Sequence, residues 1–403
     1  MSKTEKNISW KQNLFCIWLG QLLAIAGTSM VIPFIPLFIR DRLGVTDDGE
    51  LAVKTAFFYS TGMLSFCLAN PLWGAVGDRC GRKLMLMRAY FITAFTFPAV
   101  AFMPTWGCML LMRFISSMFS GTVSAAQALV AVTAPDEHQG FALGTLSAAF
   151  WSGNMLGMVA GGVVAQYYGY TTAFFIMGCF FFTGGLLTLF FVHENFEPPP
   201  KLTAQERRSW LPDFSATIWG LLCLFFFFTL ARRCDEPFLA ILISNIGGAE
   251  QAALHTGFIT ALSAVGGILS GTVFGMFSDR CKTLTLAIPA MLVAGCFMLL
   301  QASADSLLML GLARFMIFFA AGGLEPIFLA LLSHTVNADR RGSVFGWCAS
   351  FRMFGGMGSS LLGSCLVLLG GVRTVLVFGA LLMMVLVLPV ICIVRRINKS
   401  TEA

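Results

Sequence analysis

YTTAFFIMGCFFFTGGLLTLFFVH, residues 170–193, contains no Asp, Glu, Lys or Arg. The run is rich in Phe and Leu and shows no two-residue alternation of apolar and polar side chains. An α-helix needs about 20 mostly apolar residues to cross a bilayer, whereas the strands of a membrane barrel alternate. The stretch is therefore predicted to be a transmembrane α-helix.

The same composition extends along the whole chain. Of its 403 residues, 57% are hydrophobic and only 11% are charged, whereas soluble domains carry about 25% charged residues. Working outward from residues 170–193 gives twelve predicted spans: 12–38, 54–76, 83–103, 105–133, 138–162, 170–193, 214–244, 253–277, 283–303, 305–336, 340–369 and 371–394. The expected fold class is an all-α integral membrane protein with twelve transmembrane helices.

The residue types that carry catalysis or bind metals are sparse. The twelve cysteines are scattered singly and the four histidines are dispersed, with no Cys-x-x-Cys pair and no metal-ligand spacing. No nucleophile constellation and no Gly-x4-Gly-Lys-Ser/Thr loop occurs either. The sequence thus predicts no metal, no cofactor and no enzyme activity, and it argues against nucleotide-driven transport.

The positive charges predict an orientation. With both termini in the cytoplasm, the inner segments carry 17 Lys and Arg and the outer segments carry four, which is a strong positive-inside signal. The formal charge of +6 then reflects topology and contact with anionic lipid, and does not indicate a nucleic-acid partner. We expect a multi-pass protein of the cell inner membrane.

The two halves of the chain repeat one another. The repeated positions are Gly74, Asp78 and Arg79 with Gly275, Asp279 and Arg280, and Arg113-Phe114 with Arg314-Phe315, all at an offset of 201. Ordered matches at a constant offset indicate duplication. We predict a first six-helix half over residues 1–193, a cytosolic linker over 194–213 that contains Pro198-Pro199-Pro200, and a second six-helix half over 214–403.

The sharpest motif is Gly74-Ala-Val-Gly-Asp78-Arg79-Cys-Gly81-Arg82-Lys83, between spans 2 and 3 on the predicted inner face. Glycines permit a tight turn where a helix ends. A carboxylate there can meet the positive N-terminal end of a neighbouring helix. The motif is interpreted as a gating loop, with Asp279 and Arg280 as its degenerate second copy.

With this loop, the central linker and its two halves, the chain resembles the major facilitator superfamily, and within it the bacterial twelve-span drug:proton antiporters of the MdtG-like multidrug exporter type. The resemblance implies that Asp78 latches against the inner end of span 11, in a charge relay with Arg79, Arg82 and Asp136. It also implies that Arg113 is the arginine these antiporters keep in span 4, although Ser116 stands where a glutamine often follows.

Span 5 carries Gly153, Gly157 and Gly161. A spacing of four places them on one helix face, where two backbones can approach closely. The exporters keep a proline after the middle glycine, and this sequence has Met158 there. Helix packing and a gating role specific to exporters are both compatible with the pattern.

Charged residues within the spans carry most weight as site candidates. An arginine at the bilayer centre costs about 2.5–3.5 kcal/mol, so these residues are expected to be paired or hydrated, the alternative being that some snorkel from span ends. Arg232 is three and four positions from Asp235 and Glu236, and on a continuous helix all three share a face. The candidates are Arg113, Arg232, Arg233, Arg314, Arg352, Asp235, Glu236 and Glu325.

Two functions fit these residues. One is proton-coupled export of small amphipathic compounds; the other is proton-linked transport of a specific anionic or zwitterionic metabolite, because five embedded arginines exceed three acids. Glu325 is the first candidate for proton coupling. Asp235 and Glu236 come second, because Arg232 is expected to engage one of them; alternatively, Glu325 only neutralises Arg352 or Arg314. The expected partners are a small-molecule substrate, protons and the lipid bilayer, and the chain is expected to be a monomer.

The predicted topology is testable by thiol labelling. A cysteine placed at Asp48 should react with an impermeant thiol reagent added from outside the cell, because the loop at residues 46–50 is predicted to be external. A cysteine placed in the linker at Ser209 is the control, and it should react only after the membrane is opened. Labelling of position 48 from the cytosolic side alone would refute the topology.

Overall fold

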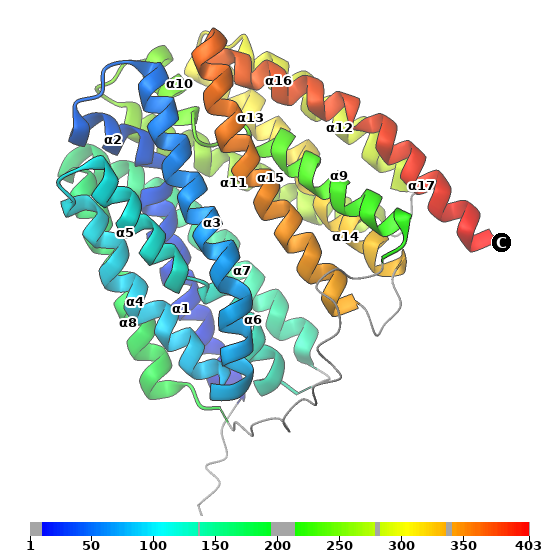
Figure 1. Ribbon diagram of the computed structural model, residues 1–403, viewed down its shortest axis with the longest axis horizontal. Coiled ribbons are helices and arrows are strands. Elements are labelled where there is room, and N and C mark those ends of the chain that lie inside the picture. The colour runs from blue at the N-terminus through cyan, green and yellow to red at the C-terminus, as the bar shows by residue number, and fades with distance from the viewer. Residues whose placement is uncertain (1–9, 136–137, 195–213, 279–282, 336–340, 403) are drawn as a thin grey trace, which may run out of the picture. The chain divides into compact units, whose positions relative to one another are not determined.

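The computed structural model describes residues 10–135, 138–194, 214–278, 283–335 and 341–402 (Figure 1). Every regular element in these ranges is a helix. Twelve helical segments in them are long and apolar enough to cross a membrane. The predicted all-α fold with twelve transmembrane helices is therefore confirmed.

The helices form two compact units, which divide within α3 (Asp48–Cys80) between Met63 and Leu64. The first unit contains the second part of α3 and the elements α1 (Trp10–Val31), η1 (Ile32–Phe34), α4 (Arg82–Ala99), η2 (Val100–Phe102), α5 (Trp106–Phe119), α6 (Thr122–Thr133), α7 (Gln139–Tyr168) and α8 (Tyr170–Phe191).

The second unit contains the first part of α3 and every helix after α8. Its other elements are α2 (Ile35–Leu43), α9 (Ala216–Arg233), α10 (Leu239–Gly247), α11 (Ala252–Ser278), α12 (Thr283–Ala302), α13 (Leu307–Gly322), α14 (Leu324–Thr335), α15 (Arg341–Gly370), α16 (Val372–Val385) and α17 (Val387–Glu402). Residues 195–213 of the predicted linker lie outside the described ranges, so the boundary between the six-helix halves stays a prediction.

Spans 1, 4, 7 and 10 are each interrupted. Span 1 passes through the short 3₁₀ turn η1, span 4 breaks at Ser120–Gly121, and span 10 breaks at Gly323. Span 7 is divided between α9 and α10 by residues 234–238. Such breaks free backbone carbonyl and amide groups, which is tolerated at membrane depth only inside protein or beside a watery cavity. The interruptions therefore mark the places where a site is expected.

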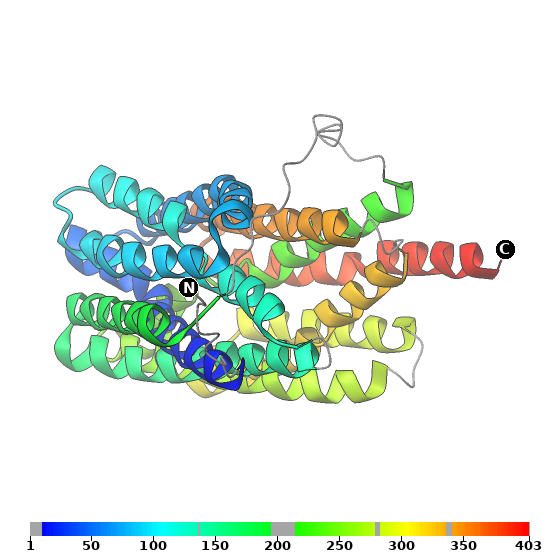
Figure 2. The ribbon, with the colours of Figure 1, turned by 90° about the horizontal axis from the view of Figure 1, so that it is seen from below.

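The same pairs of spans pack together in both halves of the sequence. In the first unit α1 lies along α7 and α8, and α4 lies along α8; in the second unit α9 lies along α15 and α16, and α12 lies along α16 (Figures 1 and 2). In span numbers, 1 packs on 5 and 6 as 7 packs on 11 and 12. This equivalence is what a duplicated helical unit produces.

Glycines bring α7 against the backbone of α1. A Cβ added at Gly153 would stand 2.8 Å from the carbonyl oxygen of Leu22, and one added at Gly157 or Gly161 would be closer still to the carbonyl of Ala26 or Met30. Real Cβ atoms do not approach so closely, and only glycine fits these three positions. Close backbone approach of this kind is the main way in which helices gain packing energy inside a bilayer.

Replacement of Gly157 by alanine tests this packing. The added methyl group must push α1 away from α7, and overpacking of this kind costs about 1–3 kcal/mol of stability. Gly144→Ala on the same helix is the control, because a Cβ there meets nothing within 4 Å. Thermal unfolding in detergent should show a clearly lower melting temperature for Gly157→Ala alone. Equal melting temperatures for the two variants would contradict the packing account.

Candidate functional site

The charged stretch of span 7 lies where its helix ends. α9 stops at Arg233, residues 234–238 form a turn, and α10 starts at Leu239. Pro237 explains the break, because it lacks an amide hydrogen and cannot continue the helix. The expectation that Arg232 shares a helix face with Asp235 and Glu236 is therefore wrong, and Arg232 pairs with neither of them in the structure.

Asp235 lies in a buried polar cluster. Its side chain forms an ion pair with Arg314 of α13 and accepts a hydrogen bond of 3.0 Å from the Gln301 amide of α12. Arg314 is only 2% exposed and Asp235 only 5%. A charge so deeply buried is tolerated when it is paired and hydrogen-bonded. The turn after α9 thus places Asp235 where two other helices supply its partners.

Glu325 stands between two arginines. Its carboxylate contacts the Arg352 guanidinium of α15 and lies 3.6 Å from Nη1 of Arg232 at the end of α9. It sits in the first turn of α14, directly after the break of span 10, where a helix N-terminus favours negative charge. Of the two alternative partners expected for a neutralised Glu325, the structure brings Arg352 to it, and Arg314 goes to Asp235.

Phe318 connects the two clusters. Its ring centroid lies 5.1 Å from the Arg232 guanidinium and 5.2 Å from that of Arg314, distances at which an aromatic face attracts a cation. The remaining acid, Glu236, pairs with Arg233 at 2.9 Å. Four arginines therefore meet three carboxylates in these pairs, which leaves one positive charge in excess, at the shared Glu325.

The first unit holds a separate cavity of about 230 Å³, lined by Gln21, Gln127, Phe150, Trp151 and four smaller or aliphatic residues. Gln21 is fixed there, because its amide donates to the Tyr90 hydroxyl at 2.8 Å and to the Thr122 carbonyl at 3.1 Å. Two amides and two aromatic rings suit a partly polar, partly flat molecule. The predicted arginine Arg113 lies elsewhere, 4.8 Å from the Phe97 ring.

The loop motif is helical through Cys80, and α4 begins directly after Gly81, whose φ of 95° favours glycine. Arg82 donates from its guanidinium to the Ala128 carbonyl at 2.9 Å. Gly74 lies within α3, whereas the side chains of Asp78 and Arg79 and the whole of Asp136, Asp279 and Arg280 lie outside what the structure describes. Their predicted gating roles stay predictions.

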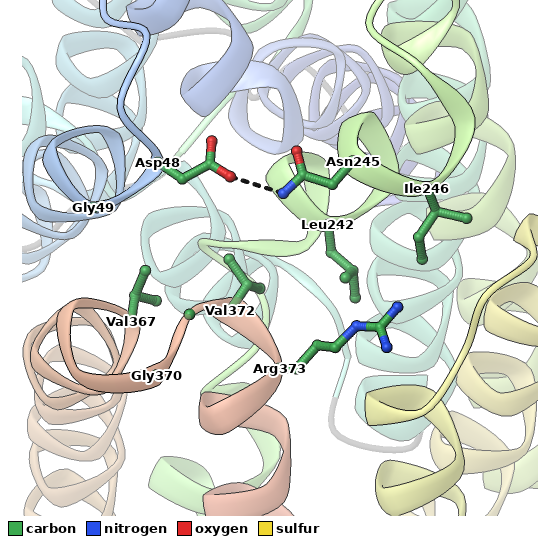
Figure 3. A pocket seen from close by; sticks show the side chains of 10 residues that line it. Asp48, Gly49, Leu242, Asn245, Ile246, Val367, Gly370, Val372 and Arg373 are labelled. Atoms are coloured by element: carbon green, nitrogen blue, oxygen red, sulfur yellow. Dashed lines mark hydrogen bonds between the residues drawn. The ribbon is translucent and has the colours of Figure 1, made fainter.

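A polar cluster ties α2 and α3 to α10 within the second unit. Asp48 pairs with Arg40 at 2.5 Å and accepts a hydrogen bond of 2.7 Å from Asn245, while Arg40 also donates to Ser244 at 3.0 Å. A cavity of about 320 Å³ adjoins this cluster and reaches Arg373 (Figure 3). Arg373 is itself paired with Asp305 at 2.8 Å. The charged groups here are paired with one another, so we interpret the cluster as a structural contact that holds these helices together.

Comparison with known protein families identifies the family of this chain. The model of the Major Facilitator Superfamily matches residues 17–247 and 221–402. The chain belongs to the major facilitator superfamily. Similar superfamily proteins include the "Multi-drug resistance efflux pump PmrA homolog" of Lactococcus lactis, 31% identical over 91% of this chain and 90% of that protein. The "Multidrug resistance protein MdtG" of Klebsiella pneumoniae is also 31% identical, over 94% and 93%.

Solved structures of other transporters share this major facilitator fold. The nucleoside transporter NupG aligns over 94% of this chain and 99% of its own, with a TM-score of 0.75 and 14% identity. A bacterial homologue of the human lysosomal transporter Spinster aligns over 97% and 98%, with a TM-score of 0.72 and 15% identity. At such identities the likeness concerns the fold alone.

The polar contacts of Gln301, Ser244 and Asn245 were not predicted by the sequence analysis. Each is an uncharged polar residue in a mostly apolar span, and such residues are also used simply to pack helices. A glutamine near the end of span 9 carries a faint signal, because a buried amide in lipid needs a partner. Its partner, Asp235, is 66 positions away, which no local pattern could indicate.

The buried pair of Asp235 and Arg314 predicts a strong asymmetry between two Asp→Asn substitutions in this major facilitator protein. Asp235→Asn leaves the Arg314 charge buried without a carboxylate, and removal of one partner of a buried pair costs about 3–5 kcal/mol. Asp305→Asn breaks the exposed pair with Arg373, and should change stability by about 1 kcal/mol or less.

Thermal unfolding of both purified variants checks this prediction. A double variant, Asp235→Asn with Arg314→Gln, removes the unpaired charge and should recover part of the lost melting temperature. If Asp235→Asn unfolds at the same temperature as Asp305→Asn, the buried pair does not hold these helices together.

Proposed function

We propose that this chain is a secondary active transporter that exports small amphipathic compounds in exchange for protons. It works by alternating access, as a monomer in the cell inner membrane with both termini in the cytoplasm. Support comes from relatives about 31% identical over nine-tenths of the chain, which are named multidrug resistance proteins and efflux pumps. The charge asymmetry along the sequence supports the orientation.

The shared carboxylate of Glu325 is the observation that carries the proton-coupling part. A coupling group must hold a proton in one state and release it in another, and neighbouring arginines decide which form is favoured. Glu325 meets one arginine from α9 and one from α15. α9 belongs to span 7 and α15 to span 11. A shift of either helix relative to α14 therefore changes the distance between an arginine and this carboxylate. Asp235 is held more rigidly, by a buried arginine and an amide.

The cavity of the first unit supports an amphipathic substrate. Phe150 and Trp151 offer flat apolar surfaces, and Gln21 and Gln127 offer hydrogen-bonding groups without charge. Uncharged polar groups with aromatic faces accept many molecules of similar shape, whereas a fixed charge selects strongly by sign. The cavity therefore fits broad recognition of aromatic compounds.

A second candidate function is favoured by one observation. The arginines around Glu325 exceed its charge by one, and an anionic or zwitterionic metabolite would supply the missing negative charge. In that case the chain is a proton-linked transporter of such a metabolite. Liposomes with an imposed pH gradient separate the two proposals when they are offered a fluorescent aromatic cation, such as ethidium, and labelled organic anions in parallel.

Glu325→Gln tests the coupling proposal. The substitution keeps the shape of the side chain and removes the group that binds the proton. Substrate binding, and substrate exchange across the membrane at equal pH, should persist. Substrate accumulation driven by a pH gradient should fall by about tenfold or more, because the group that carries the proton is lost. The measurements are substrate uptake and exchange in liposomes that contain the purified protein.

Glu236→Gln is the matched control, because Glu236 forms a neighbouring pair that is about one-third exposed, and this variant should keep gradient-driven uptake. Two results count against coupling at Glu325. One is gradient-driven uptake at the wild-type rate in Glu325→Gln. The other is a parallel fall of expression, binding and exchange, which would identify Glu325 as a structural partner of Arg352.

A further inference from the structure

The start of α4 lacks a capping side chain of its own. The residue before it, Gly81, has no side chain that could accept a hydrogen bond, and no side-chain cap forms there. The first backbone amides of a helix have no partner within the helix. They also carry the positive end of the helix dipole. An acceptor, preferably an anion, must therefore reach this end from elsewhere.

Glu194 supplies that acceptor from a distant part of the chain. Its Oε1 accepts from the Arg82 amide at 2.9 Å and its Oε2 from the Lys83 amide at 2.7 Å. Lys83 in turn donates from its ammonium group to the Leu189 carbonyl, in the last turn of α8, at 3.0 Å. The end of α8 and the start of α4 thus satisfy each other's free backbone groups.

The segment that carries Glu194 is itself anchored. Val192 is fully buried. The backbone of His193 forms a reciprocal pair with the Asn13 side chain of α1, with one hydrogen bond of 2.8 Å and one of 3.1 Å. Glu194 is therefore held on α1 and α8 while its carboxylate grips α4. Arg82 also donates to a carbonyl of α6. The contacts around Glu194 and Arg82 therefore involve four helices: α1, α4, α6 and α8.

We propose that Glu194 is a positioning residue for transport: it holds the Gly81–Lys83 end of the loop motif in place, so that the loop can act as a gate. The role rests on the proposed function. It joins two features that the sequence keeps apart, because Glu194 is the first residue of the predicted linker and Arg82 belongs to the gating motif. Through this carboxylate, the first residue of the predicted linker sets the position of the predicted gate.

Glu194→Gln tests the proposal with two readouts. A glutamine offers one oxygen, and its NH₂ group faces an amide that also donates, so one charge-assisted hydrogen bond is lost and the other is weakened. Hydrogen exchange of the Arg82 and Lys83 amides, followed by mass spectrometry on the purified full-length protein, should become about tenfold faster or more. Substrate transport in liposomes should slow by a similar factor, while substrate binding and the melting temperature change little.

His193→Ala is the matched control, because His193 contacts Asn13 through its backbone alone. In this variant, exchange of the Arg82 and Lys83 amides and substrate transport should both match wild type. Glu194→Asp keeps the charge on a shorter side chain and should give intermediate exchange and transport. It replaces Glu194→Gln if the latter does not fold.

Unchanged exchange in the Glu194 variants would overturn the proposal, and so would faster exchange with wild-type transport. If wild-type protein carries none of the compounds offered, the proposed function fails, and the exchange measurement still decides whether Glu194 holds the loop.

Discussion

Lipid offers no hydrogen bonds, so each polar group inside the membrane must find its partner within the protein. This constraint explains why the embedded charges of the second unit are found in pairs. Asp235 meets Arg314, Glu236 meets Arg233, and Glu325 meets Arg232 and Arg352. It also explains the uncharged Gln301, which completes the surroundings of Asp235. Among the described charges in these pairs, Glu325 is the carboxylate that faces two arginines, and in the proposed function this excess of positive charge responds to a proton or to a substrate.

The same constraint acts on the backbone. Interrupted spans and span ends expose carbonyl and amide groups, and side chains from distant parts of the chain satisfy some of them. The carbonyl of Ser120, at the break of span 4, accepts from Arg88 at 3.3 Å, and the amides at the start of α4 donate to Glu194. The breaks that make room for charged and polar side chains are also the places where long polar side chains hold neighbouring helices in register.

Close packing, and not the hydrophobic effect, stabilises the association of helices in lipid. Apolar side chains gain little by leaving lipid for one another, so helix pairs depend on close backbone contact. Gly153 and Gly161 give α7 that contact with α1, and Gly355 does the same for α15, where a Cβ would meet the carbonyl of Phe226 in α9. The two contacts occupy equivalent span pairs, 5 with 1 and 11 with 7. Repeated small residues thus accompany the repeated arrangement of helices.

The sequence alone determined the number of spans, the all-α class and the superfamily, because hydrophobic length and the loop motif are local properties that survive without knowledge of any contact. It also singled out every charged residue of the Asp235 and Glu325 clusters. Only the tertiary structure decided how these residues pair. Pro237 ends α9 after Arg233 and turns Asp235 toward Arg314, so spacing along an assumed continuous helix gave the wrong partner for Arg232. Glu194 shows the same limit: an acid at the end of a span looks ordinary in sequence, and its role appears only when folding brings it to Arg82, 112 positions away.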